Sequence, residues 1–325
     1  MRDNFDRQIE YLRVSITDRC NFRCSYCMPP HGVKWLSHDE ILSYEELLRL
    51  IDIFSREGIK YVRLTGGEPL VRKGIVDFVA AVKGLGRIDD LALTTNGSLL
   101  PQYAAQLKAA GLDRVNISLD TVDPERFAKI TYCGRLEDTL LGVESALAAG
   151  LTPVKLNVVL TEALSESDLA YFIEQVHRYP ISVRFIERMP MGRRRRSAAG
   201  PDVAAVKKLL EATGLGTLIP AETRGNGPAR YWRLPEAQGT FGFITPISDH
   251  FCSACNRLRL TADGRLRPCL LTEREIDVKT PLRAGASDSQ LAELFYAAIR
   301  EKPDGHTLCQ ARRPGSRRAM SQIGG

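Results

Sequence analysis

Residues 20–27 read CNFRCSYC and follow an apolar run, residues 11–16, that has the length of a buried strand. Their three cysteines stand at a C-x3-C-x2-C spacing, so one short loop can turn all three sulfurs toward a single metal centre. Thiolates are soft ligands that select iron–sulfur clusters, zinc or copper(I). A [4Fe–4S] cluster normally takes four cysteines, so this loop predicts a cluster with one iron left open. Structural zinc, with His31 as the fourth ligand, is the alternative.

Strand-like and helix-like segments alternate from residue 10 to about residue 215. The predicted strands are Tyr11–Ile16, Tyr61–Leu64, Leu91–Thr94, Val115–Leu119, Val154–Val159 and Val183–Ile186. The predicted helices are Tyr44–Arg56, Ile75–Lys83, Tyr103–Ala110, Leu136–Ala149 and Ser167–Tyr179. Asp123 and Pro124 match a helix cap followed by a first-turn proline. The alternation predicts a parallel sheet, which carries its ligands beyond the carboxyl ends of its strands.

The sequence changes character beyond residue 215. After a helix expected over Val203–Ala212, it becomes rich in glycine and proline, with short strand-like runs, up to about residue 281. Asp263 and Gly264 separate two of these runs and predict a tight hairpin. A last helix is expected over Asp288–Arg300. We therefore expect two domains, residues 1–215 and residues 216–325.

Composition and charge indicate a globular, cytoplasmic protein. The first residues are polar, and no apolar run approaches the roughly 20 residues that span a bilayer. Eight cysteines without a secretion signal favour metal or redox chemistry over disulfides, and Cys133 and Cys309 are assigned no role. The net charge of +6 fits an anionic small molecule as well as nucleic acid. The run Arg193–Arg196 is interpreted as a solvated loop rather than a nucleic-acid patch.

Short polar motifs follow the next predicted strands. In TGGEP (residues 65–69) two glycines allow the backbone to approach a ligand closely, and Glu68 offers a carboxylate to an ammonium group. An ordinary strand-to-helix turn explains this motif equally well. TTNG (residues 94–97) and NISLD (residues 116–120) place small polar side chains at the same edge of the sheet, where they suit ribose hydroxyls.

A second group of three cysteines comprises Cys252, Cys255 and Cys269. The predicted hairpin at residues 263–264 brings the third cysteine back toward the first two. A fourth thiolate is not evident, and His250 completes a tetrahedral zinc site as readily. The spacing alone leaves an iron–sulfur cluster and zinc equally open here.

Cations adjoin this second group and also interrupt the predicted strands. Arg257 and Arg259 lie two residues apart, so their guanidinium groups share one face of a strand and match phosphate oxygens. Four more cations lie within or near strands: Arg13, Arg63, Lys155 and Arg184. A buried charge is costly without a partner, so this set indicates a polyanionic ligand. The alternative partners are the carboxylates of Glu68, Asp120 and Glu187.

These motifs resemble those of the radical S-adenosylmethionine (SAM) enzymes, whose signature is C-x3-C-x2-C followed by GGEP. Within them the chain is similar, nearly end to end, to the GTP 3′,8-cyclase family of molybdenum cofactor biosynthesis. The matching motifs are RVSITDRCNFRCSYCMP (13–29), VRLTGGEPLVR (62–72), TTNG (94–97), VNISLDT (115–121), VKLNVVL (154–160), RFIERMPMG (184–192), FCSACNRLRL (251–260) and the terminal IGG. A radical SAM enzyme for a peptide or another cofactor precursor is the nearest alternative, against which the arginines beside Cys255 argue.

The resemblance implies a partial (β/α)6 barrel of the TIM type, with a C-terminal iron–sulfur module across its mouth. By position, Cys20, Cys24 and Cys27 would hold a [4Fe–4S] cluster that binds SAM, and Cys252, Cys255 and Cys269 a second one that meets the guanine of GTP. The implied SAM contacts are Tyr26, Gly67, Glu68, Ser118 and Met189. The implied GTP contacts are Arg13, Arg63, Thr94, Lys155, Arg257 and Arg259. No further catalytic side chain is assigned.

The implied reaction converts GTP to (8S)-3′,8-cyclo-7,8-dihydroguanosine 5′-triphosphate. Reductive cleavage of SAM gives a 5′-deoxyadenosyl radical, which abstracts H3′ of GTP. The same resemblance implies an external one-electron donor of the flavodoxin or ferredoxin type, and handover of the product to cyclic pyranopterin monophosphate synthase. We expect a monomer or homodimer, with neither nucleic acid nor a membrane as a partner.

Overall fold

Six parallel strands form the centre of the computed structural model, which describes residues 1–29, 31–161, 164–189, 202–306 and 318–324. These strands are β1 (Tyr11–Ser15), β2 (Tyr61–Thr65), β3 (Asp90–Thr95), β4 (Arg114–Ser118), β5 (Val154–Leu160) and β6 (Ile181–Glu187). Each strand pairs in parallel with the next one along the chain. The six predicted strands are therefore confirmed, with small shifts at their ends.

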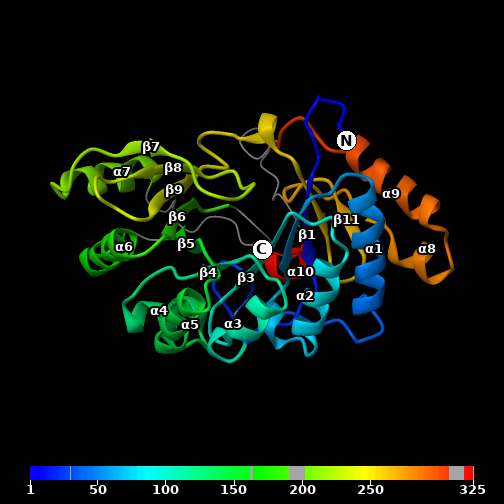
Figure 1. Ribbon diagram of the computed structural model, residues 1–325, viewed down its shortest axis with the longest axis horizontal. Coiled ribbons are helices and arrows are strands. Elements are labelled where there is room, and N and C mark those ends of the chain that lie inside the picture. The colour runs from blue at the N-terminus through cyan, green and yellow to red at the C-terminus, as the bar shows by residue number, and fades with distance from the viewer. Residues whose placement is uncertain (30, 162–163, 190–201, 307–317, 325) are drawn as a thin grey trace.

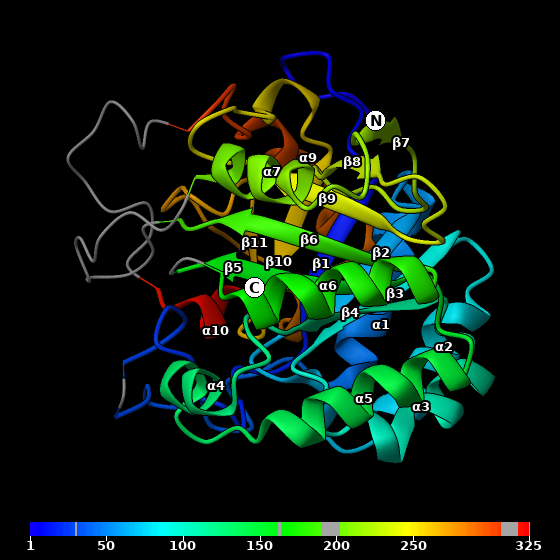
Figure 2. The ribbon, with the colours of Figure 1, turned by 90° about the vertical axis from the view of Figure 1, so that its left-hand side faces the viewer.

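Helices cover the outer face of this curved sheet (Figures 1 and 2). They are α1 (Tyr44–Arg56), α2 (Ile75–Gly84), α3 (Leu100–Ala109), α4 (Pro124–Thr131), α5 (Leu136–Ala148) and α6 (Glu166–Arg178). At the start of α1, the Ser43 hydroxyl accepts from the Glu46 N–H and the Glu46 carboxylate accepts from the Ser43 N–H. The helix α4 begins at the predicted cap, Asp123 and Pro124, although its full length was not predicted.

The C-terminal part of the chain extends both edges of the sheet. On one side β10 (Arg257–Leu260) pairs in parallel with β1 and continues into β11 (Arg265–Arg267) and β12 (Ile276–Asp277). On the other side β9 (Thr240–Ile244) pairs in parallel with β6 and continues into β8 (Arg230–Arg233) and β7 (Ile219–Ala221). The described strands thus form one open sheet, so the predicted partial barrel is confirmed.

Three further helices belong to this C-terminal part, and α7 (Val203–Ala212) precedes it. The helices α8 (Lys279–Arg283) and α9 (Asp288–Arg300) lie beside α1 in Figure 1. The short helix α10 (Met320–Ile323) lies near the middle of the molecule in the same view. The Gly324 carbonyl after it accepts a hydrogen bond from Arg259 Nη1 at 2.5 Å, so the end of the chain reaches the inner face of the sheet.

Alternation along the strands explains why charged residues interrupt apolar runs. Leu12 and Val14 of β1 are fully buried in the apolar core, whereas Arg13 between them lines a cavity on the opposite face. Val62 and Leu64 of β2 flank Arg63 in the same way. The inner face of the sheet is therefore the polar one.

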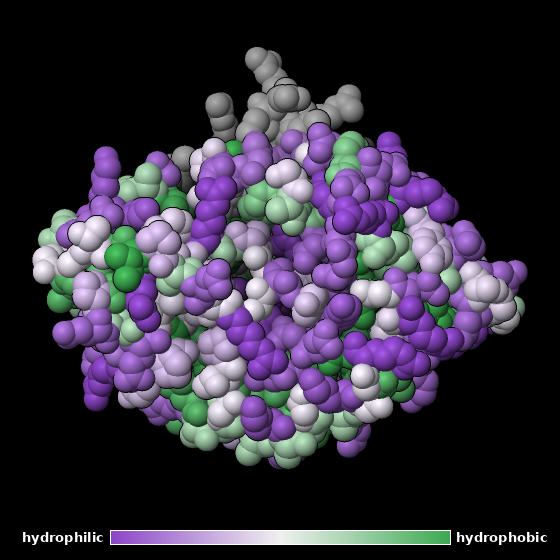
Figure 3. Space-filling model, turned by 45° about the horizontal axis from the view of Figure 1, so that its top comes forward, coloured by the Kyte–Doolittle hydropathy of each residue, from purple (hydrophilic) through white to green (hydrophobic). Residues whose placement is uncertain are grey.

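The outer surface carries mainly hydrophilic residues on the face shown in Figure 3, with apolar residues scattered among them. None of the helices in the described part of the chain has the length and apolar character that a bilayer-spanning segment needs. Arg193–Arg196 and Cys309 lie outside the described residues, and Cys133 is exposed.

Candidate active site

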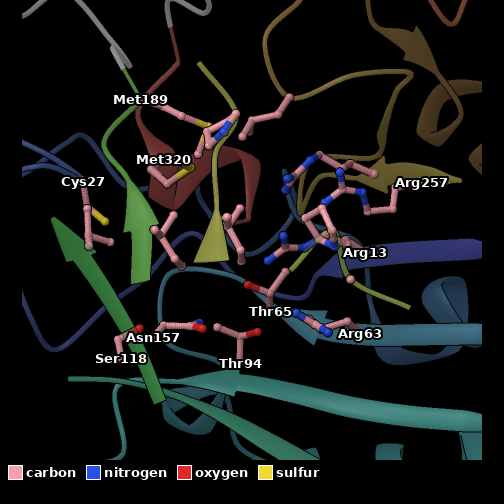
Figure 4. A pocket seen from close by; sticks show the side chains of 18 of the residues that line it. Arg13, Cys27, Arg63, Thr65, Thr94, Ser118, Asn157, Met189, Arg257 and Met320 are labelled. Carbon is pink, nitrogen blue, oxygen red and sulfur yellow. The ribbon is translucent and has the colours of Figure 1, made fainter. Parts of the chain in front are cut away.

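One cavity of about 300 Å³ occupies the inner face of the sheet and brings most of the predicted site residues together. All six clustered cysteines line it, and all six are free thiols. Figure 4 shows Cys27 and Met189 on one side of the cavity, with Arg13 and Arg257 on the other. The two cysteine groups and the predicted cations therefore share a single site.

The first cysteine group lies on the loop that follows β1. The Cys27 and Met28 N–H groups both donate to the Cys24 carbonyl, at 2.9 and 3.1 Å, which curls the loop tightly around its sulfurs. The loop also rests on α4, because the Ser25 N–H donates to the Ile130 carbonyl. Burial raises the pKa of the Cys20 thiol to about 12, with the nearby Glu68 carboxylate adding to the shift. The buried loop disfavours thiolates that lack a partner, so a metal cation that replaces the thiol protons would be bound favourably here.

The glycines of the TGGEP motif have a role that the sequence did not reveal. The Gly67 N–H donates to the Thr17 carbonyl at 2.7 Å, and the Glu68 N–H donates to the Arg19 carbonyl at 2.8 Å. A Cβ atom on Gly67 would lie 2.2 Å from the Arg19 oxygen. What approaches these glycines closely is therefore the backbone of residues 17–19, which leads into the cysteine loop.

Replacing Gly67 with alanine should displace the cysteine loop, since the added methyl group overlaps a backbone oxygen that cannot give way. We expect a loss of about 1–3 kcal/mol in the free energy of unfolding and reduced iron binding by the first cysteine group. Thermal unfolding and iron analysis would measure both. The control is Gly84→Ala at the end of α2, where a Cβ meets no atom within 4 Å. Equal behaviour of the two variants would contradict this role.

Two buried carboxyl groups lie near the first cysteine group. Glu68 accepts hydrogen bonds from Thr95 Oγ1 and from the Leu70 and Asn96 N–H groups, and burial still raises its pKa to about 7. Asp120 accepts from Tyr26 Oη at 2.8 Å and from the Val159 N–H, and burial raises its pKa to about 6. Both groups would gain from a cationic ligand. Three more predicted SAM contacts also line the cavity: Gly67, Ser118 and Met189.

Three arginines form a row across neighbouring strands on the inner face. Arg13 of β1 is in register with Arg259 of β10 on one side and with Arg63 of β2 on the other. Burial, together with the Arg257 cation, lowers the pKa of Arg259 to about 10. Burial likewise lowers the pKa of Arg63 to about 10. Arg257 and Thr94 also line the cavity, so five of the six predicted GTP contacts gather there.

Lys155 is the sixth predicted GTP contact, and the structure does not place it in the cavity lining. Its Nζ donates to the Arg224 carbonyl and, at 3.2 Å, to Tyr231 Oη. It belongs to the second position of β5, the amino end of the strand, although we expected the site at the carboxyl ends. Burial, together with the cations of Arg184, Arg114 and Arg63, lowers the pKa of Lys155 to about 5.

The carboxylates that were considered as ion-pair partners of the strand cations accept hydrogen bonds from other groups. Glu187 accepts from the Ile247 and Ser248 N–H groups, at 2.8 and 3.0 Å. Glu68 and Asp120 accept the N–H and O–H donors already described. Arg184 instead donates to the side-chain oxygens of Asn157 and Asn116. This pattern favours an external polyanion over internal ion pairs.

The second cysteine group is assembled from two segments. Cys252 begins the short turn η2 (Cys252–Ala254), Cys255 directly follows this turn, and Cys269 follows β11. Burial raises the pKa of Cys255, but the adjacent Arg257 and Lys302 cations outweigh it and bring the pKa down to about 6. The group therefore offers a thiolate even before metal binds.

The two histidines that were considered as zinc ligands, His31 and His250, lie in different surroundings. His31 is exposed and does not belong to the cavity lining. His250 does lie near Cys252, and so does His306, with their ligand atoms within 4.8 Å of one another. His250 Nδ1 is 3.0 Å from His306 Nε2, and both contact the Pro246 carbonyl. The positions of His250 and His306 are therefore compatible with a metal site that includes a histidine.

Several residues in the cavity wall were not singled out from the sequence: Tyr11, Asn157, Lys302, His306 and Met320. Only Asn157 carried a usable signal, because it is a polar residue within an otherwise largely apolar predicted strand. Lys302 and His306 lie beyond the last predicted helix, in a stretch without periodicity.

Two family models match the chain, "Radical SAM superfamily" over residues 14–176 and "Molybdenum Cofactor Synthesis C" over residues 181–308. The chain is 54% identical, over the full length of both chains, to GTP 3′,8-cyclase of Heliobacterium modesticaldum. It is 51% identical to the protein of that name from Pelotomaculum thermopropionicum, again over the full length of both. The chain belongs to the GTP 3′,8-cyclase family. The family predicted from the motifs is thereby confirmed.

Solved structures support the fold. Streptococcus suis SuiB bound to S-adenosylmethionine superposes with a TM-score of 0.63 at 14% identity, over 97% of this chain and 77% of that chain. Native anSMEcpe with bound AdoMet gives a TM-score of 0.55 at 15% identity, over 90% of this chain and 81% of that chain. At such low identity the likeness concerns the fold alone.

Proposed function

We propose that the protein is a GTP 3′,8-cyclase that converts GTP to (8S)-3′,8-cyclo-7,8-dihydroguanosine 5′-triphosphate in the first step of molybdenum cofactor biosynthesis. One observation carries this proposal: two groups of three free thiols line a single cavity together with a row of arginines. Full-length identity of 54% to a protein of that name supports it. The chain is accordingly a radical SAM enzyme that uses SAM and [4Fe–4S] clusters.

The donor sets fit two iron–sulfur clusters. Each set offers three thiol sulfurs that line the same cavity, and within each set the charges of the other two thiolates raise the pKa of Cys24 and of Cys252. Cys20, Cys24 and Cys27 would hold the first cluster, and Cys252, Cys255 and Cys269 the second. When bound, the first cluster supplies the electron that splits SAM into methionine and the 5′-deoxyadenosyl radical, which removes H3′ of GTP.

The chain's own residues bind and orient SAM in this proposal. Glu68 would accept from the SAM ammonium group, since its carboxylate is buried and gains from a cation. Tyr26 is fixed by its hydrogen bond to Asp120, which aims its ring at the cavity. The Gly67 backbone, Ser118 and Met189 would complete the SAM pocket. The surrounding wall excludes water from a radical that would otherwise react with solvent components.

The arginine row would hold the GTP triphosphate. Arg13, Arg63 and Arg259 present guanidinium groups from adjacent strands, and such groups bind phosphate oxygens in pairs. Arg257 and Thr94 would contact the remainder of the nucleotide. Mutual repulsion among buried cations is relieved when a polyanion binds, which gives affinity for the triphosphate.

An anaerobic incubation tests the function directly. The protein, reconstituted with iron and sulfide, is mixed with SAM, a reductant and GTP, and 5′-deoxyadenosine and the cyclised nucleotide are measured by mass spectrometry. We expect both products to rise together with GTP and not with ATP. A failure of 5′-deoxyadenosine to rise with GTP refutes the cyclase. A colourless protein that contains zinc and no acid-labile sulfide would instead support a zinc-stabilised nucleic-acid-binding protein.

GTP binding should take up a proton through Lys155. In the ligand-free protein the pKa of Lys155 is about 5, so its amine is neutral at pH 7. When the triphosphate neutralises Arg63, one of the cations that lower this pKa, the repulsion falls and a larger share of the amine becomes protonated. GTP affinity should then decrease as the pH rises through the pKa of the bound state.

Calorimetry in buffers of different ionisation enthalpy measures this uptake. We expect a net uptake of protons on GTP binding at pH 7, and clearly less uptake for Lys155→Met. Lys129→Met, which removes an exposed lysine from α4, should match the parent. Proton uptake that survives Lys155→Met contradicts the assignment.

Two further roles belong to this proposal. An external one-electron donor of the flavodoxin or ferredoxin type would supply the electrons, and cyclic pyranopterin monophosphate synthase would receive the product. The division into residues 1–215 and 216–325 and the monomer or homodimer state remain predictions.

A further inference from the structure

Lys302 is a buried lysine in the cavity wall, beside the second cysteine group. The residue is 3% exposed, and it lies two positions after the end of α9. Lysine is rarely buried this completely unless a partner compensates its charge. Neither the SAM contacts nor the GTP contacts proposed above include it. Its position therefore requires a separate explanation.

The hydrogen bonds of the Lys302 ammonium group are made to residues of the second cysteine group and to their neighbours in sequence. Its Nζ donates to Cys255 Sγ at 3.4 Å, to the Arg257 carbonyl at 2.7 Å and to the Pro268 carbonyl at 2.9 Å. An ammonium group has three N–H donors, so each of them has a partner here. Arg257 lies two residues after Cys255, and Pro268 directly precedes Cys269. One side chain thus ties together the segments that carry two of the three cysteines.

Arg7 ties the third cysteine to the same structure. It is buried, pairs with Asp3, and donates to the Cys252 carbonyl at 2.8 Å. It also donates to the carbonyls of Pro303 and Asp304, the residues that follow Lys302. Arg7 therefore contacts backbone around the site, whereas Lys302 also contacts a sulfur.

A donor aimed at a ligating sulfur has a known electrostatic consequence. Hydrogen bonds and positive charge at cysteine sulfurs stabilise the reduced form of an iron–sulfur cluster and raise its potential. Cys255 Sγ receives such donors from Lys302 at 3.4 Å and from Arg257 Nη2 at 3.6 Å. Low local polarity in the buried site strengthens both interactions.

We propose that Lys302 is a positioning residue for the second cluster, holding the Cys255 and Cys269 segments and raising the reduction potential of the cluster through its bond to Cys255 Sγ. This inference rests on the proposed assignment of Cys252, Cys255 and Cys269 as cluster ligands. Iron and sulfide analysis of the parent protein tests that assignment separately, so the two can fail independently.

A redox titration isolates the effect. In a full-length chain carrying Cys20→Ala, Cys24→Ala and Cys27→Ala, only the second cluster remains. The oxidised cluster takes one electron from titanium(III) citrate, which is oxidised, and electron paramagnetic resonance counts the reduced clusters. For Lys302→Met in this background we expect about a tenfold lower ratio of reduced to oxidised cluster at a fixed potential, ~59 mV for a one-electron couple.

Matched variants separate this role from a merely structural one. Lys279→Met also removes one positive charge and one bond to a backbone carbonyl, that of Glu40, and should leave the ratio unchanged. Arg7→Met should lower iron retention and shift the potential less than Lys302→Met does, because Arg7 is paired with Asp3 and donates to no cysteine sulfur. Lys302→Arg keeps a cationic N–H donor and should restore most of the parent value.

Retention of iron with an unshifted potential in Lys302→Met overturns the proposal. If that variant does not fold, Lys302→Gln carries the test, since the amide keeps an N–H donor without the charge. A smaller shift to lower potential is expected there, and an unchanged potential in that variant equally overturns the proposal.

Discussion

Cys24→Ala is expected to abolish the cleavage of SAM while leaving the second cluster in place. Cys24 is the middle cysteine of the loop after β1, and its carbonyl accepts the N–H groups of both Cys27 and Met28. Two thiolates cannot hold a [4Fe–4S] cluster whose fourth position is already given to SAM. Iron and sulfide should therefore fall from about eight to about four per chain, and 5′-deoxyadenosine should fall to the background level.

A matched control exists within the chain. Cys133 is an exposed free cysteine that lies outside both groups, so Cys133→Ala removes a thiol without touching the proposed sites. This variant should retain the parent's iron content and activity. Retained SAM cleavage by Cys24→Ala, measured anaerobically with the same reductant, would sink the assignment of the first cluster.

Local signals in the sequence were sufficient for most of the fold. Apolar runs of strand length alternated with helical periodicity, and the paired strands β1–β6 followed from that alternation alone. The cysteine spacings also predicted the two cysteine groups, and the structure brings both groups to the same cavity. The hairpin at Asp263 and Gly264 was also predictable from a local signal, the Asp-Gly pair, and Gly264 indeed adopts the positive φ of +73° that such a turn requires.

Long-range contacts escaped prediction. Pairing of β10 with β1 and of β9 with β6 joins segments far apart in sequence, and it is this pairing that aligns Arg259 with Arg13. Lys302 reaches Cys255 across 47 positions, and no periodicity marks either residue as a partner of the other. Lys155 is a case in which the motif predicted a contact that the structure does not place in the cavity lining. Its Nζ instead donates to the Arg224 carbonyl and to Tyr231 Oη, which are distant in sequence.

Cys269→Ala should produce the complementary loss, sparing SAM cleavage and removing the cyclisation of GTP. Cys269 follows β11 and lines the cavity together with Arg257 and Arg259, and Figure 4 shows Arg257 on the side away from Cys27. Its removal leaves Cys252 and Cys255 as two thiolates of the second group, so iron should fall from about eight to about four.

The activity of this variant decides what the second group does. The first cluster should still cleave SAM with a strong reductant, at a slow rate that GTP no longer stimulates, because the nucleotide has lost its anchor beside the arginine row. Comparison with Cys24→Ala gives the control, since both variants hold four iron and only one should form 5′-deoxyadenosine. Intact cyclisation by Cys269→Ala would show that GTP is positioned by the arginines alone.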